Sequence, residues 1–139
     1  MSYKSLESQF IFENALISSR ISKTVDNQLS VHGISFTEYM IMHHLNAALL
    51  KTMRRIEIAQ CVGISASGVT RLIAPMEKNG IVEKESNPRD ARQSLVKLSK
   101  VGERLYEEAS VSFEHCCKSL LKVFSNNQIE KLIELSGRI

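Results

Sequence analysis

The fold is decided by residues 64–99, which read ISASGVTRLIAPMEKNGIVEKESNPRDARQSLVKLS. Ser65 is a good N-cap residue, and it predicts a helix that runs to Asn79 and is stopped by Gly80. Inside this helix the apolar residues recur at i, i+3, i+4 and i+7, which predicts one buried face made of Val69, Leu72, Ile73 and Met76. The opposite face is polar and is expected to face outward.

Two strand-like runs follow this helix. Residues 81–85 and 94–98 alternate apolar with charged or polar side chains, which is typical of half-buried strands. The segment between them, 86–93, contains Asn87-Pro88 and two arginines, and therefore predicts a turn. We expect a two-stranded β-hairpin with a long, basic tip.

A short helix over residues 54–61 precedes the quoted stretch, and Val62-Gly63-Ile64 forms a tight turn between the two helices. Further upstream, Ser35 and Glu38 form a capping box that opens a helix over the following residues. Residues 46–52 are expected to be a loop or a frayed helix end. The order helix, turn, helix, hairpin predicts a winged helix-turn-helix.

Long helices flank this module. An apolar stripe predicts a helix over 5–31, ended by Gly33. Ser99 caps a last long helix whose apolar period continues to Phe124, and Ser125-Asn126-Asn127-Gln128 opens a short final helix. The fold class is thus mainly α. Residues 1–139 are expected to form a single domain, with 35–100 as the winged helix and 1–34 and 101–139 as flanking helices.

The charge is unevenly distributed along the chain. The net charge is only +3, but residues 51–104 hold 11 lysines and arginines against 6 acidic residues. A basic segment attracts phosphates. There is no long apolar run and no apolar signal core near the N-terminus, so we expect a cytoplasmic protein without a membrane partner. Three cysteines suit neither a disulfide framework nor a zinc site.

The order of elements within the basic stretch predicts binding to double-stranded DNA. In a helix-turn-helix the start of the second helix lies in the major groove, so it must be polar and short-sided. The corresponding side chains here are Ser65, Ser67, Thr70 and Arg71. Serine and threonine hydroxyls contact bases or phosphates, and arginine binds guanine through two hydrogen bonds.

The hairpin tip supplies a second set of cationic groups. Arg89 and Arg92 flank Asp90 on a turn stiffened by Pro88. Arginine on a stiff loop enters a narrow minor groove, and Asp90 can hold one guanidinium in direction. Arg54, Arg55 and Lys78 are candidate phosphate contacts, with plain surface positions as the alternative.

These features resemble the MarR family of bacterial regulators over nearly the whole chain. The matching pieces are IS-x-S-x-VTRLI, ME-x-NGIV, RDAR at the wing tip and LS-x-x-G before the last long helix. The resemblance implies a homodimer joined by the first and last helices, a pseudo-palindromic operator, repression, and release by a small molecule or by oxidation. The sequence also has no nucleophile–base pair, phosphate-cradling loop or paired acidic cleft signature, so we expect neither an enzyme nor a cofactor.

The sequence departs from the family's pattern in two places. The wing tip has Asn87 where aspartate is common and Ala91 where a second basic residue is common. Pro75 lies deep in the recognition helix, where it deletes one backbone hydrogen bond and crowds the carbonyl of Arg71. We therefore expect a bend or local irregularity between Arg71 and Pro75.

The remaining candidates concern regulation. The resemblance implies an effector pocket between the dimer helices and the DNA-binding part, where Phe36, Tyr39, Met40 and His43 lie on suitable segments for a small aromatic effector. Cys116 and Cys117 are candidates for a thiol switch, against their alternative role as small apolar residues on the helix stripe. Cys61 is expected to pack under the recognition helix. No histidine or cysteine spacing predicts a metal site. A winged helix used for protein assembly remains the other alternative.

Overall fold

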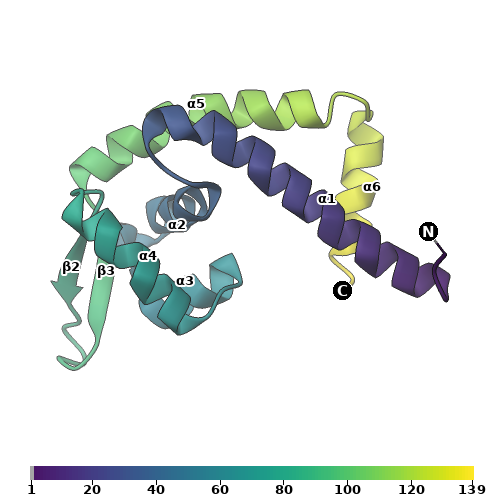
Figure 1. Cartoon of the computed structure of the whole chain (residues 1–139). Helices are drawn as coiled ribbons and strands as arrows, with labels where there is room; N and C mark the ends of the chain where they lie inside the picture. Colours follow the sequence, from purple (N-terminus) through teal and green to yellow (C-terminus); the bar gives the residue numbers. More distant parts are fainter. Residues whose placement is uncertain (1) are drawn as a thin grey trace.

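The computed structural model describes residues 2–139 and consists mainly of helices (Figure 1). Helix α1 spans Leu6–Leu29 and continues into the short 3-10 helix η1, Ser30–His32, before Gly33 ends it in the left-handed conformation. Helix α2 spans Phe36–Ala47, and its start is the expected capping box, in which Ser35 Oγ accepts from Glu38 N–H. The first two helices therefore follow the sequence expectation closely.

The central module contains the expected helix pair. Helix α3 spans Arg55–Val62, Gly63 turns the chain with φ 75°, and helix α4 spans Ala66–Lys78. The two helices meet at 106°. No single helix among residues 2–139 is long and apolar enough to cross a membrane, although α3 and α4 taken together would pass on length and composition.

Helix α4 remains one continuous helix through Pro75, so the expected irregularity does not interrupt it. Pro75 and Arg71 both lie on the exposed side of the helix. The hydrogen bond that Pro75 removes, to the Arg71 carbonyl, therefore lies on the solvent side of the helix and not on its core side. The side opposite is buried through Val69, Ile73 and Met76, whose packing outweighs the cost of one missing bond.

The sheet has one strand more than expected. Strands β2 (Val82–Ser86) and β3 (Ser94–Leu98) form the predicted antiparallel hairpin, with Val82 opposite Leu98. A third strand, β1 (Thr52–Arg54), pairs with the other edge of β3, which gives the order β1-β3-β2. Residues 46–52 are thus not simply a loop, because they contain the 3-10 helix η2 (Leu49–Lys51) and the first residue of β1.

Helix α5 spans Lys100–Leu120 and helix α6 spans Asn126–Ser136. Helix α5 ends four residues before Phe124, the last position of its apolar period, and a turn takes up the residues between. The core lies where α1, α2, α4 and α5 meet the sheet, and its largest fully buried side chains include Leu29, Ile41, Met42, Leu45, Ile58, Ile73, Met76 and Leu98. Figure 1 shows α6 and the start of α1 at the end of the molecule opposite the hairpin.

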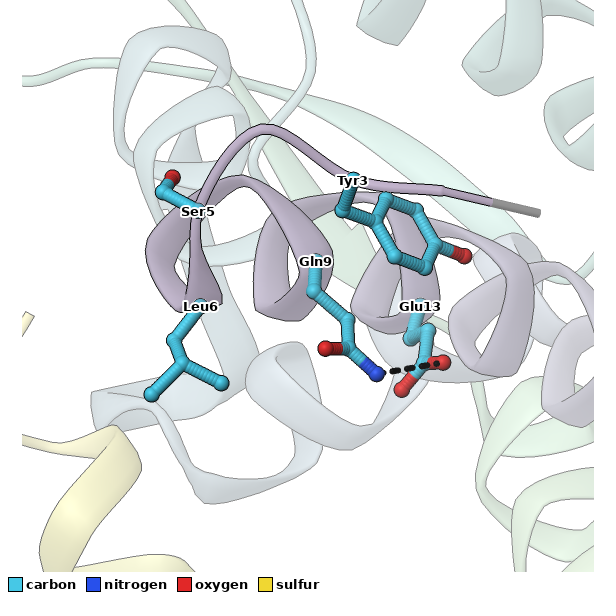
Figure 2. A pocket seen from close by; sticks show the side chains of 5 residues that line it. All are labelled: Tyr3, Ser5, Leu6, Gln9 and Glu13. Carbon is cyan, nitrogen blue, oxygen red and sulfur yellow. Dashed lines mark hydrogen bonds between the residues drawn. The ribbon is translucent and has the colours of Figure 1, made fainter.

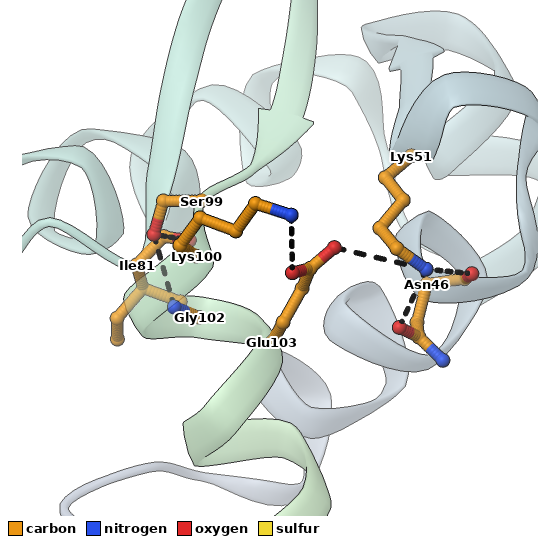
Figure 3. A network of polar contacts seen from close by, with 7 residues as sticks. All are labelled: Asn46, Lys51, Ile81, Ser99, Lys100, Gly102 and Glu103. Atoms are coloured by element: carbon orange, nitrogen blue, oxygen red, sulfur yellow. Dashed lines mark hydrogen bonds and ion pairs between the residues drawn. The ribbon is translucent and has the colours of Figure 1, made fainter.

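The start of α5 is fastened to the sheet by Ser99 and Gly102. Ser99 Oγ accepts from Gly102 N–H at 2.9 Å, and its one proton is shared between the carbonyl oxygens of Gly80 and Ile81. Figure 3 shows the contacts with Gly102 and Ile81. One turn further, Glu103 forms ion pairs with Lys51 at 3.8 Å and Lys100 at 3.5 Å. These contacts join the end of α4, the hairpin and α5, so the wing is held in a fixed position relative to the long helix.

Candidate nucleic-acid interface

The start of α4 is capped by its own serines. Ser65 has extended backbone angles, and its Oγ accepts from Gly68 N–H at 3.0 Å. Ser67 Oγ lies 3.1 Å from Ser65 Oγ, and both side chains are exposed. The Ser65 side chain is therefore used to cap the start of α4, whereas the Ser67 hydroxyl can still hydrogen-bond a partner outside the chain.

The outward face of α4 holds the predicted side chains and two more. Ser67, Thr70, Arg71 and Lys78 are all exposed, opposite the buried face. Ala74 and Pro75 are exposed on the same side and were not among the predicted residues. The helical period of the apolar face could have identified them, because positions 74 and 75 fall outside that period.

The hairpin tip is organised by two short side chains. Asn87 Oδ1 accepts from Arg89 N–H, and Asp90 Oδ1 accepts from Arg92 N–H, both at 3.0 Å. Asp90 Oδ1 also lies 3.4 Å from Arg92 Nε, which is the predicted orienting pair. Asn87 thus forms the turn that an aspartate would form. The Arg92 side chain is 92% exposed, so this ion pair directs the guanidinium without sequestering it.

Three arginines from distant segments converge at the root of the wing. A cavity of about 280 Å3 lies between the start of α3 and the start of β3, and it is lined by Arg54, Arg55, Ile56, Arg92, Gln93 and Ser94. Arg55 Nη1 is buried and has no hydrogen-bond partner within the described part of the chain. Such an unpaired donor beside two other guanidinium groups favours an anion, and DNA phosphate is one.

Arg54 is partly neutralised by its own helix. Its Nε lies 3.1 Å from Glu57 Oε1, which also accepts from the Arg54 backbone N–H at 2.9 Å. That backbone hydrogen bond and then the Arg54 side chain lower the pKa of Glu57 from its usual value. Arg55 is therefore a stronger phosphate candidate than Arg54, and Lys78 lies apart from both at the far end of α4.

Known protein sequences identify the family of this chain. The model of the MarR family matches residues 32–93. A relative in Bacillus subtilis (strain 168), the uncharacterized HTH-type transcriptional regulator YwoH, is 30% identical over 115 residues, which cover 83% of this chain and 82% of YwoH. The chain belongs to the MarR family. It is accordingly a DNA-binding transcriptional regulator and not an enzyme.

Solved MarR-family structures share its fold. Sco3205 from Streptomyces coelicolor, solved in complex with DNA, superposes with a TM-score of 0.87 at 20% identity, covering 98% of this chain and 87% of that one. The S. aureus MepR–DNA complex superposes with a TM-score of 0.83 at 17% identity, covering 93% and 94%. BldR from Sulfolobus solfataricus superposes with a TM-score of 0.85 at 19% identity over the full length of both chains. At these identities the likeness is one of fold.

The effector candidates of this MarR-family chain lie in the seam between α2 and α5. Tyr39 is buried, its hydroxyl lies 2.8 Å from Ser110 Oγ, and its ring packs on Tyr106 and Phe113. Burial raises the pKa of Tyr39 to about 12. His43 Nδ1 lies 2.8 Å from the Tyr106 hydroxyl, and Phe36 packs against Phe113. These side chains fill the seam with contacts to one another, and Met40 lies half-buried beside them.

The cysteines do not look like a thiol switch. Cys116 is buried and Cys117 is half-buried, and neither is in a disulfide. Burial, then Glu114 and Cys116, raises the pKa of the Cys117 thiol, which disfavours the reactive thiolate. Cys61 does not pack under the recognition helix as predicted, because it is exposed. Cys61 lies in the last turn of α3, one residue before the helix ends at Val62.

An open hollow lies far from the wing, at the start of α1. It has a volume of about 570 Å3 and is lined by Tyr3, Ser5, Leu6, Gln9 and Glu13 at the start of α1 (Figure 2). Gln9 Nε2 donates to Glu13 Oε1 at 3.3 Å along its floor. Among residues 2–139 no group of three or more histidine, cysteine or acidic side chains is placed to hold a metal ion.

Proposed function

We propose that this MarR-family regulator is a homodimer that binds a pseudo-palindromic operator. Each protomer would place the start of α4 in a major groove and the β2–β3 tip in the adjoining minor groove. The observation that carries this proposal is the common orientation of these two parts. In Figure 1 the hairpin tip and the turn between α3 and α4, where α4 begins, lie at the same lower side of the molecule, away from α5.

The proposal assigns a role to each of the exposed polar residues. Ser67, Thr70 and Arg71 would contact base edges, and Ser65 would hold the helix start. Arg92, directed by Asp90, would enter the minor groove together with Arg89. Arg54, Arg55 and Lys78 would contact phosphates. Because these contacts release counterions, the affinity for DNA would fall steeply as salt rises.

The dimer is supported by the apolar surface at the other end of the chain. Six apolar side chains of the first half of α1 are each more than half exposed: Leu6, Phe10, Ile11, Phe12, Leu16 and Ile17. Helix α6 adds Leu132, Ile133 and Leu135, which are 44–68% exposed. So many exposed apolar side chains at one end of the molecule are unfavourable in water, and a second copy would cover them. Two copies joined there would present two recognition helices to successive major grooves.

We further propose that the regulator represses transcription in the cytoplasm and is released by a small aromatic effector. The support is the position of the α2–α5 seam, which joins the DNA-binding module to a dimer helix. A ligand that separates Tyr39 from Tyr106 would shift the module relative to its partner. A thermal-shift screen of aromatic acids, followed by DNA titration with each hit, tests this part; hits that raise the melting temperature but leave DNA affinity unchanged would contradict it.

The DNA-binding proposal is tested by selecting bound sequences from random duplexes and measuring the mass of the protein in solution. We expect a two-fold symmetric consensus with half-sites about 10 bp apart and a species of twice the chain mass. A monomer that selects no sequence, at any salt concentration that keeps it folded, would instead favour the winged helix as a protein-assembly module.

A further inference from the structure

Arg71 is the one guanidinium on the outward face of α4, and it is exposed and uncommitted. Among residues 2–139 its side chain makes no hydrogen bond or ion pair, whereas Arg54 pairs with Glu57 and Arg92 pairs with Asp90. Its donors are therefore free for a partner outside the chain. In a major groove the best partner for two adjacent guanidinium N–H donors is guanine, which accepts through O6 and N7.

Thr70, its neighbour on the same face, has a hydroxyl that is already engaged. Thr70 Oγ1 donates to the Ala66 carbonyl at 3.3 Å, one helical turn back. A hydroxyl has a single proton, so in this conformation Thr70 cannot also donate to a base. The Thr70 side chain is exposed, and its methyl group, which makes no hydrogen bond, is available for an apolar contact.

Thymine alone among the four bases presents a methyl group in the major groove. We infer that Thr70 is a specificity-determining residue that reads the 5-methyl group of a thymine through its own methyl group, beside a guanine read by Arg71. The inference rests on the proposed DNA-binding function. Residues 70 and 71 are separated by about 1.5 Å along the helix axis, so the two bases would lie within about two base pairs of each other.

The alternative is that the Thr70 hydroxyl bonds a base, either by leaving the Ala66 carbonyl or by accepting from a base amino group while it keeps that bond. The two roles are separated by two conservative variants. Thr70→Val keeps a methyl group and removes the hydroxyl, whereas Thr70→Ser keeps the hydroxyl and removes the methyl group. Thr24→Ser is the matched control, because the Thr24 hydroxyl makes the same backbone bond, to Arg20, on α1.

The experiment selects sequences from random duplexes with the full-length wild type and measures affinity for the consensus by fluorescence anisotropy at one salt concentration. The same duplex is then made with deoxyuridine in place of the chosen thymine in each half-site, which deletes only the methyl group. We expect the wild type, Thr70→Val and Thr24→Ser to bind the uracil duplex about fourfold more weakly per half-site, the factor that burial of one methyl-sized group supplies. Thr70→Ser should bind both duplexes equally.

Two results would overturn the inference while leaving the proposed function intact. One is a Thr70→Ser protein that still discriminates uracil from thymine at every selected position. The other is a Thr70→Val protein that loses the consensus while Thr70→Ser keeps it, which would assign the reading to the hydroxyl. If the wild type selects no sequence at all, the inference and the proposed function fall together. Selection with Arg71→Ala should lose the guanine, and an unchanged guanine preference would refute the role of Arg71.

Discussion

Gly102 is the position where a single added methyl group should cost most. A Cβ atom at Gly102 would overlap the carbonyl oxygen of Ile81 and would lie 2.7 Å from Leu98 Cδ1. The Ile81 oxygen is backbone and cannot rotate away. It also accepts hydrogen bonds from Ser99, from the backbone N–H at 3.0 Å and from Oγ at 2.9 Å. The close approach of α5 to the end of α4 therefore requires a residue without a side chain.

The magnitude of Gly102→Ala follows from two opposing effects. In an open helix interior, glycine to alanine stabilises by about 1 kcal/mol. Here the overlap forces a backbone shift, which typically costs about 1–3 kcal/mol, and the shift weakens a buried hydrogen bond of Ser99 worth about 1 kcal/mol. We expect a net loss of about 2 kcal/mol in the free energy of unfolding, which corresponds to roughly 6 °C in Tm at about 3 °C per kcal/mol.

The assay is urea unfolding followed by circular dichroism, at one protein concentration for all variants because a dimer's stability depends on concentration. Glu107→Ala serves as the control, since Glu107 lies exposed on the same helix and makes no ion pair within residues 2–139. The free energy of unfolding of Glu107→Ala should stay within about 0.5 kcal/mol of the wild-type value. A Gly102→Ala protein as stable as the wild type, or more stable, would refute the packing argument.

Other substitutions probe the interface and its supports. Arg92→Ala should weaken DNA binding by about 1.5–3 kcal/mol at matched salt without changing the unfolding midpoint, and equal affinities in anisotropy titrations would count against its role. Ser65→Ala should lower stability by about 1 kcal/mol through the lost cap, whereas Ser67→Ala should leave it nearly unchanged; equal losses in urea would show that the cap is misassigned. The lowered pKa of Glu57 means that its contribution to stability is present above its unfolded pKa, near 4.5, and is lost as pH falls through the lower folded value. Glu57→Gln should therefore lower stability slightly at neutral pH, and the gap to the wild type should close as pH falls below about 4.5; a variant whose profile parallels that of the wild type would contradict this.

Local chemistry was enough to predict most elements. Ser35 with Glu38 and Ser125 with Gln128 are capping boxes whose two partners are three residues apart, and both were predicted from that spacing. The hairpin turn around Asn87 and the Asp90–Arg92 pair are equally local. In each case the interacting residues are close in sequence, so their spacing alone predicts the contact.

The features that escaped prediction depend on distant contacts. Strand β1 has only three residues and exists because Met53 lies opposite Val96, across more than forty residues of chain. The convergence of Arg54, Arg55 and Arg92 on one cavity has the same origin. The exposure of Cys61 depends on which side of α3 the core covers. Near a helix end, a short apolar period defines that side poorly.

The most direct test of the central claim probes both grooves of one duplex in one experiment. Dimethyl sulfate methylates guanine N7 in the major groove and adenine N3 in the minor groove, so a footprint on the selected duplex reports on α4 and the wing together. We expect the wild type to protect guanines within each half-site and adenines in the adjoining minor groove. Arg71→Ala should lose the first protection and Arg92→Ala the second. Protection confined to one groove, or unchanged by both variants, would contradict the claim that the start of α4 and the wing tip bind the same face of the DNA.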